Sequence, residues 1–200
     1  ALAAGALPNP ATFAYCGAPA GKPGTCRDDD ILGRLKISWT MGYRQDATGK
    51  PVKFNTQGIE DPNGDRIMYD HLYAYGGRSF SIWDQDGKLV WDSGAQFERM
   101  LASDSCKIGP DRDESCVTYF NTGHDEKATF DSRSASKGPE PEGVEIGVMG
   151  DKTFAFIGLE RMGGVMVYDI TDPKAPVSMD YLNTRANWTE APSNENPAKM

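Results

Sequence analysis

Apolar and polar residues alternate strictly in one stretch near the start of the chain, where every second residue from Leu35 to Met41 is apolar. Strict alternation predicts a half-buried β-strand, because successive side chains of a strand point to opposite faces of a sheet. A short aromatic strand is predicted at residues 71–75, which end at Gly76-Gly77.

Residues 80–91 predict a β-hairpin. Residues 80–85 and 88–91 are rich in apolar and aromatic side chains and flank Asp86-Gly87. An Asp-Gly pair between two strands favours a type I′ turn, because both central residues must accept positive φ. The opposed pairs in that register are Ile82 with Trp91 and Trp83 with Val90. Both faces of the hairpin then carry apolar pairs, so we expect neighbouring sheets to cover both.

Four short strands are predicted between residues 143 and 183, separated by turns that contain Gly, Asp or Pro. Four strands in about 40 residues match one blade of a β-propeller. The hairpin region and residues 143–183 also have similar sequences, since Trp83-Asp84 corresponds to Tyr168-Asp169. We expect the aromatic residues on these strands to lie in the core, namely Trp39, Trp83, Trp91 and Tyr168.

The predicted fold class is therefore all-β, with propeller-type blades of four-stranded antiparallel sheet and long loop insertions. The predicted regions are an irregular disulfide-containing arm (1–30), a first blade region (31–95), a long insertion with a cysteine pair (96–142), a second blade (143–183) and a loop (184–200). Two blades cannot close a ring, since propellers have about four to eight. We expect a partial propeller, a fragment completed by further blades of the same or a longer chain.

The cysteines fall into two pairs, Cys16 with Cys26 and Cys106 with Cys116. Closing these two short loops is the simplest connectivity, and four unpaired thiols are the alternative. Two local disulfides favour an oxidising compartment, which means secreted, periplasmic or cell-surface localisation.

Charge and motifs exclude several classes of function. The net charge is −8, and no basic stripe offers the clustered Lys and Arg that a nucleic-acid backbone requires. No apolar run approaches the roughly 18 residues of a membrane span. The sequence contains no nucleophile elbow, phosphate-binding loop or H-E-x-x-H pair, and we predict no catalytic residues.

Four motifs stand in order along the chain: Leu32–Ile37, Gly77–Asp84, Lys137–Gly143 and Phe156–Pro173. Together they resemble the bacterial choice-of-anchor I domain, which is related to the mesenchyme-specific cell-surface glycoproteins linked to biomineralisation in sea urchins. The resemblance runs from about residue 31 to residue 185. It implies an exported β-propeller, often anchored at the cell surface. Bacterial members are often labelled alkaline phosphatase.

One departure from the family concerns the residues just before the Lys137–Gly143 motif. The family tends to carry acidic residues there, whereas this chain has Ala135 and Ser136. A cation site that depends on those carboxylates is in question here.

A calcium site is predicted at Asp61, Asn63 and Asp65, with Asp70 further along the chain. Calcium prefers six to eight oxygen ligands, and a D-x-N-x-D loop turns three oxygen side chains toward one point. Arg66 occupies the position where an EF-hand loop has Gly, so that geometry is not matched. The alternative is an Asx-rich turn whose side chains cap their own backbone.

A second acidic cluster is predicted near the propeller axis, where the innermost strands of all blades converge. Carboxylates gathered there repel one another unless a divalent cation, Arg161 or Lys137 compensates them. Solvated loop charges paired with those bases are the alternative. The cluster consists of Glu140, Glu142, Glu145 and Glu160, with Arg161 beside them.

These observations predict a non-enzymatic, exported or cell-surface propeller segment that binds calcium and serves as a scaffold or mineral-associated protein. Its expected partners are the remaining blades and mineral or cell-surface components. The alternative is a calcium-dependent phosphoesterase, a phosphoric monoester hydrolase whose site is completed by blades outside this chain. A protein-binding module that uses the propeller loops is a third possibility.

Overall fold

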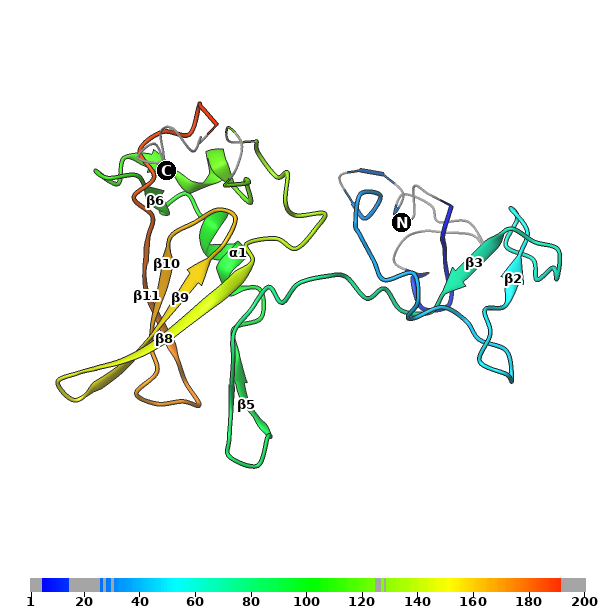
Figure 1. The fold of residues 1–200 in the computed structure, drawn as a ribbon, viewed down its shortest axis with the longest axis horizontal. Coiled ribbons are helices and arrows are strands. Elements are labelled where there is room, and N and C mark those ends of the chain that lie inside the picture. Colours follow the sequence, from blue (N-terminus) through cyan, green and yellow to red (C-terminus); the bar gives the residue numbers. More distant parts are fainter. Residues whose placement is uncertain are drawn as a thin grey trace. The chain divides into compact units, whose positions relative to one another are not determined.

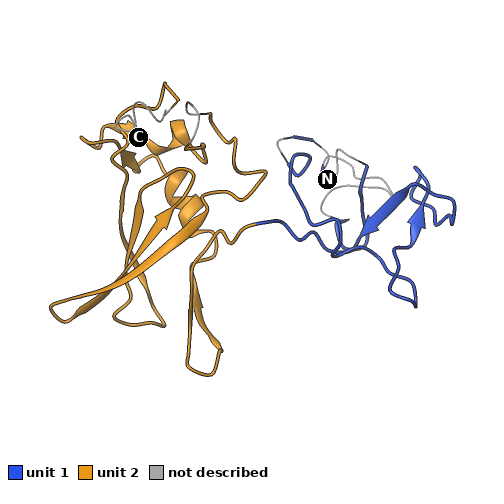
Figure 2. Ribbon diagram, in the orientation of Figure 1, with its two compact units in different colours: residues 1–75 blue, residues 76–200 orange. Residues whose placement is uncertain are grey.

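The computed structural model describes residues 5–14, 26, 28–29, 31–124, 127 and 129–191. The chain divides into two compact units, residues 1–75 and residues 76–200 (Figure 2). Strands are the main regular elements of both units, and the described part holds one α-helix of six residues (Figure 1). The predicted all-β class is confirmed.

The second unit is built on a four-stranded antiparallel sheet in the order β11-β10-β9-β8. Its strands are β8 (Pro141–Met149), β9 (Lys152–Leu159), β10 (Val165–Asp169) and β11 (Val177–Leu182). Each strand pairs with the next along the chain, as in a propeller blade. The four strands predicted between residues 143 and 183 are confirmed, and β8 is an edge strand, as the innermost strand of a blade must be.

The core lies on one face of this sheet. Alternate residues of β9 and β10 are buried there, with Tyr168 at its centre and fully enclosed. The cover comes from the segment predicted as an insertion, which contributes α1 (Gln96–Leu101) with buried Phe97 and Leu101. The other elements of the segment are β6 (Lys107–Ile108), β7 (Glu114–Ser115) and a 3-10 helix (Cys116–Tyr119).

The predicted disulfide between Cys106 and Cys116 is confirmed, and both cysteines belong to this core. Cys26 is also disulfide-bonded. Cys16, its predicted partner, lies outside the described residues.

The predicted hairpin forms from β4 (Ser81–Trp83) and β5 (Leu89–Asp92), and the pairing of Ile82 with Trp91 is confirmed. The pairing of Trp83 with Val90 is wrong, because a bulge after Ile82 shifts the register and sets Trp83 opposite Leu89.

Neighbouring sheets were expected to cover both faces of this hairpin, and in the described residues they do not. At its base, the rings of Phe80 and Trp91 pack 4.9 and 6.2 Å from the ring of Tyr168. Trp83 is 59% exposed, so the prediction that it lies in the core is wrong within the described structure. The physical reason is that α1 and the β8–β11 sheet contact only the base of the hairpin, whereas its tip projects away from them (Figure 1).

The first unit has little regular structure. It contains β1 (Leu7–Pro8), β2 (Lys53–Phe54) and β3 (Arg66–Tyr69), in the order β1-β3-β2 with β1 parallel to β3. A small core of Leu7, Phe54 and Met68 holds these strands together.

The strands predicted at 35–41 and 71–75 are reduced to a single bridge between Ile37 and Ala74. Gly42 turns the chain at φ 78° and approaches the carbonyl of His71 too closely for any side chain, and a second bridge follows it between Tyr43 and Tyr69. Trp39 is 75% exposed, so its predicted core position is wrong. The region predicted as a first blade, residues 31–95, is divided between the two units.

Candidate functional site

The predicted calcium loop forms a turn stabilised by its own side chain. One carboxylate oxygen of Asp61 accepts the backbone N–H of Asn63 at 2.9 Å, and the carbonyl of Asp61 accepts the N–H of Gly64 at 2.8 Å. This is an Asx turn, in which a side chain caps its own backbone, and calcium binding at this loop stays a prediction.

The other two predicted calcium ligands lie in separate interactions. Asp65 pairs with Arg66 at 3.4 Å and is exposed. One carboxylate oxygen of Asp70 accepts hydrogen bonds from Asn9 at 2.6 Å and from Arg44 at 3.1 Å. Among the described residues, the three aspartates predicted as ligands do not form a group with donor atoms within 4.8 Å of one another.

The structure does bring together three members of the second predicted cluster. Glu140, Glu142 and Glu160 each place one carboxylate oxygen within 4.8 Å of the others. Glu140 directly precedes β8 and Glu160 directly follows β9, and the N–H of Glu160 donates to the carbonyl of Glu140 at 2.8 Å. The antiparallel pairing of these strands therefore joins residues that are far apart in sequence. Glu145 is not part of the group, since it lies further along β8, opposite Phe156, and is exposed.

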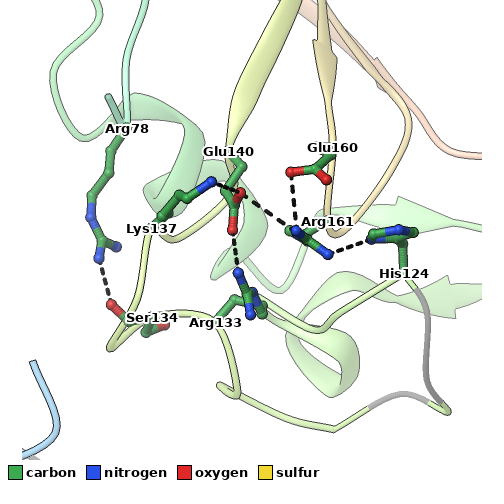
Figure 3. Close-up of polar contacts among 8 residues, drawn as sticks. All are labelled: Arg78, His124, Arg133, Ser134, Lys137, Glu140, Glu160 and Arg161. Atoms are coloured by element: carbon green, nitrogen blue, oxygen red, sulfur yellow. Dashed lines mark hydrogen bonds and ion pairs between the residues drawn. The ribbon is translucent and has the colours of Figure 1, made fainter. Parts of the chain in front are cut away.

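The side chain of Glu140 is 1% exposed and contacts three bases (Figure 3). Arg133 donates to its Oε1 at 2.7 Å, and Lys137 and Arg161 lie 3.1 and 3.6 Å from its Oε2. Burial raises the pKa of this carboxyl, but the hydrogen bonds from Arg133 and Lys137 outweigh burial and lower the pKa to about 2. Glu140 is therefore ionised at neutral pH although it is buried.

The neighbouring carboxyl is shifted in the opposite direction. Burial and the hydrogen bond shared with Glu140 raise the pKa of Glu160, although Arg161 lies 3.1 Å away. Glu142 is exposed and makes no ion pair within the described structure. A third contact of Arg161, to His124 Nδ1 at 3.2 Å, extends the network to a pocket of about 350 Å³ lined by His124 and Glu160.

The loop before β8 holds two of the three bases, Arg133 and Lys137. A second set of hydrogen bonds connects this loop to α1. Arg78 donates to Glu98 of α1 at 2.7 Å. It also donates to the carbonyl of Ser134 (Figure 3). The buried side chain of Asn121 joins Glu98 to Ser134. Gly138 has φ 69°, and a Cβ there would collide with the Arg78 guanidinium.

The Lys137–Gly143 motif thus places the side chain of Glu140 in contact with its three bases. Sequence reasoning identified Lys137 and Arg161 but missed Arg133, and it also missed the supporting residues Arg78, Glu98 and Asn121. No spacing rule links these positions, because the contacts arise only when the long loop folds back over α1.

Two of the three carboxylates, Glu140 and Glu160, pair with the three bases and form an ion-pair network that ties the loop to the sheet. Burying a lone carboxylate is costly, and the bases remove most of that cost. Ala135 and Ser136 lie in the same loop and add no carboxylate to the cluster.

Comparisons with known proteins agree with the motifs. A family model described as "Choice-of-anchor I domain" matches residues 43–173, which is more than half of the chain. Gigasin-3a of Magallana gigas is 28% identical over 169 residues, which cover 82% of this chain and 50% of Gigasin-3a. The mesenchyme-specific cell surface glycoprotein of Strongylocentrotus purpuratus is 26% identical over 112 residues, 52% of this chain and 14% of that protein.

The chain thus spans about half the length of Gigasin-3a and a smaller share of the sea-urchin protein. No solved structure matches the chain. Within the described residues, no helix has the length and apolar character needed to cross a bilayer.

Proposed function

Because the chain belongs to the choice-of-anchor I domain family, we propose that it is a non-enzymatic scaffold segment of an extracellular or cell-surface protein. In this proposal the β8–β11 sheet is one blade, and further blades pack against it. The scaffold holds surface or mineral components outside the cell. The name of the sea-urchin relative describes a cell surface glycoprotein, and we extend that location to this chain.

The observation that carries the proposal is an uncovered apolar strip on the edge strand of the sheet. Val144 and Ile146 of β8 pair with Ile157 and Ala155 of β9, so they lie on the core face of the sheet. The β9 residues are buried, whereas Val144, Ile146 and Val148 are 66%, 51% and 70% exposed. Blades of a propeller pack face to face, and such packing would cover this strip.

Divalent cation binding belongs to the proposal at the acidic cluster. The six oxygens of Glu140, Glu142 and Glu160 are of the type that calcium prefers. Lys137 is the most exposed of the three bases around Glu140, with 42% of its side chain in solvent, so it can withdraw when a cation enters. Glu142, which has no base of its own, is then the residue on which cation affinity depends most.

Calcium titration with thermal unfolding tests the cation part of the proposal. Calcium is expected to raise the Tm of the wild-type chain but not that of Glu142→Gln, since binding to the folded state stabilises it by mass action. Asp61→Asn is the matched control in the predicted loop and keeps the calcium response. A response lost in Asp61→Asn and kept in Glu142→Gln would assign the cation to the loop instead.

Hydrolysis of a phosphate monoester tests the non-enzymatic part. We expect no turnover of p-nitrophenyl phosphate above the buffer rate, with or without calcium. Turnover that requires calcium and disappears in Glu142→Gln would overturn the proposal in favour of a phosphoesterase.

A further inference from the structure

An open groove of about 520 Å³ crosses the surface of the first unit. Its lining combines aromatic rings with a few charged side chains: Trp39, Tyr69 and Tyr75, and Lys36, Asp65 and Arg66. Concave sites of this composition are typical of small-molecule and sugar-sized ligands, where apolar walls give contact and a few polar groups give orientation. All lining residues belong to one unit, so the groove does not depend on how the two units are arranged.

The aromatic residues of the groove present their rings to solvent. Trp39 is 75% exposed and Tyr75 is 47% exposed. Tyr69, in contrast, is buried. Its hydroxyl donates to the carbonyl of Trp39 at 3.3 Å and so holds the backbone that carries the indole. An indole held by its backbone, with its face uncovered, offers a flat apolar surface without further rearrangement.

The charged residues of the groove favour an anionic ligand. Lys36 and Arg66 contribute two positive charges, whereas Asp65, paired with Arg66 at 3.4 Å, contributes one negative charge. The groove is thus positive in a chain whose net charge is −8. The Arg66 guanidinium lies directly against Gly5, where a Cβ would be 2.1 Å from Nη1. Guanidinium and ammonium groups bind carboxylates and sulfates by charge-assisted hydrogen bonds.

We propose that this groove binds an anionic polysaccharide, with a sugar ring stacked on Trp39 and its carboxylate or sulfate group on Lys36 and Arg66. The C–H groups on one side of a sugar ring pack on an aromatic face, while its hydroxyls stay in water. An open groove with exposed rings suits this mode, whereas protein partners are anchored by side chains that fill deep, desolvated pockets. The proposal is independent of the blade and of the acidic cluster in the second unit.

The test is calorimetric titration of this chain with a heparin-derived hexasaccharide at about 50 mM salt, where screening of exposed charges is weak. Trp39→Ala is expected to weaken binding about tenfold, the loss expected when a stacked ring is removed. Since Trp39 is largely exposed, its replacement leaves the fold intact, which circular dichroism checks. Lys36→Gln is expected to weaken binding about threefold, and this difference shrinks as salt rises.

Trp83→Ala is the matched control, because Trp83 is also an exposed indole but lies on β4 in the second unit. It is expected to bind the hexasaccharide as the wild-type chain does. The proposal is overturned if Trp39→Ala binds unchanged, if both tryptophan variants lose affinity equally, or if no binding occurs. Equal Trp39-dependent binding of poly-glutamate would also overturn it, in favour of an acidic peptide, and equal binding of neutral dextran would refute the role of charge.

Discussion

Replacing Glu140 by Gln is expected to destabilise the second unit strongly at neutral pH. The carboxyl of Glu140 has a pKa lowered from 4.5 to about 2 by the bases around it. A shift of this size contributes about 3 kcal/mol to stability at pH 7, since one pKa unit corresponds to about 1.4 kcal/mol. The substitution also leaves Arg133, Lys137 and Arg161 facing one another without their shared anion. Breaking a buried ion pair on one side costs about 3–5 kcal/mol.

The stability that Glu140 contributes is expected to fall as the pH is lowered. Because the folded pKa of Glu140 is depressed, its contribution is fully present above pH 4.5 and is lost as pH falls toward about 2. The wild-type chain should lose about 2 kcal/mol of this contribution by pH 3, whereas Glu140→Gln has none to lose. The raised pKa of Glu160 acts in the opposite direction and reduces the net change.

Urea unfolding at pH 7 and pH 3, followed by tryptophan fluorescence and circular dichroism, measures both quantities. Glu142→Gln is the matched control, because it removes an exposed carboxylate of the same cluster and should change stability by less than about 0.5 kcal/mol. If Glu140→Gln is as stable as Glu142→Gln at pH 7, or if the gap between the wild-type chain and Glu140→Gln does not narrow at pH 3, the account of the buried ion-pair network is refuted.

Three further predictions concern the core and its cover. Removing the Cys106–Cys116 disulfide by a double change to Ala should lower stability by about 2–3 kcal/mol, the entropic value for closing so short a loop, and calorimetry would measure the loss. Leu101→Ala should lower stability by about 2–5 kcal/mol, because the side chain is fully buried. Ile146→Ala, on the exposed strip, should lower it far less. Equal losses of stability in urea unfolding would contradict the described core. Tyr168→Phe removes the hydroxyl that donates to Gln96 at 3.1 Å, and a loss of about 1 kcal/mol is expected; an unchanged urea midpoint would show that this bond adds nothing.

Local patterns predicted the second unit well and the first unit poorly. The strands between residues 143 and 183 are short apolar runs that are separated by clear turns and pair with their neighbours in sequence, so each step depends on local information. The strand predicted at 35–41 alternates strictly, but within it only Ile37 forms a bridge, and the chain turns at Gly42. Alternation describes which side chains could share a face, and it does not provide a neighbouring strand.

The acidic cluster was predicted in part for a related reason. Glu140, Glu142 and Glu160 lie at the paired ends of β8 and β9, which a hairpin brings together in any blade. Arg133 was missed because its contact with Glu140 depends on the path of a long loop. The bulge after Ile82 was missed because the Asp-Gly turn alone indicates a register without it.

The most direct test of the central claim is a crystal structure of the natural polypeptide that contains this chain. The account predicts that the β8–β11 sheet lies between other four-stranded sheets and that Val144, Ile146 and Val148 are buried against one of them. If these three side chains remain in solvent in that structure, the sheet is not a propeller blade and the proposed scaffold role is contradicted.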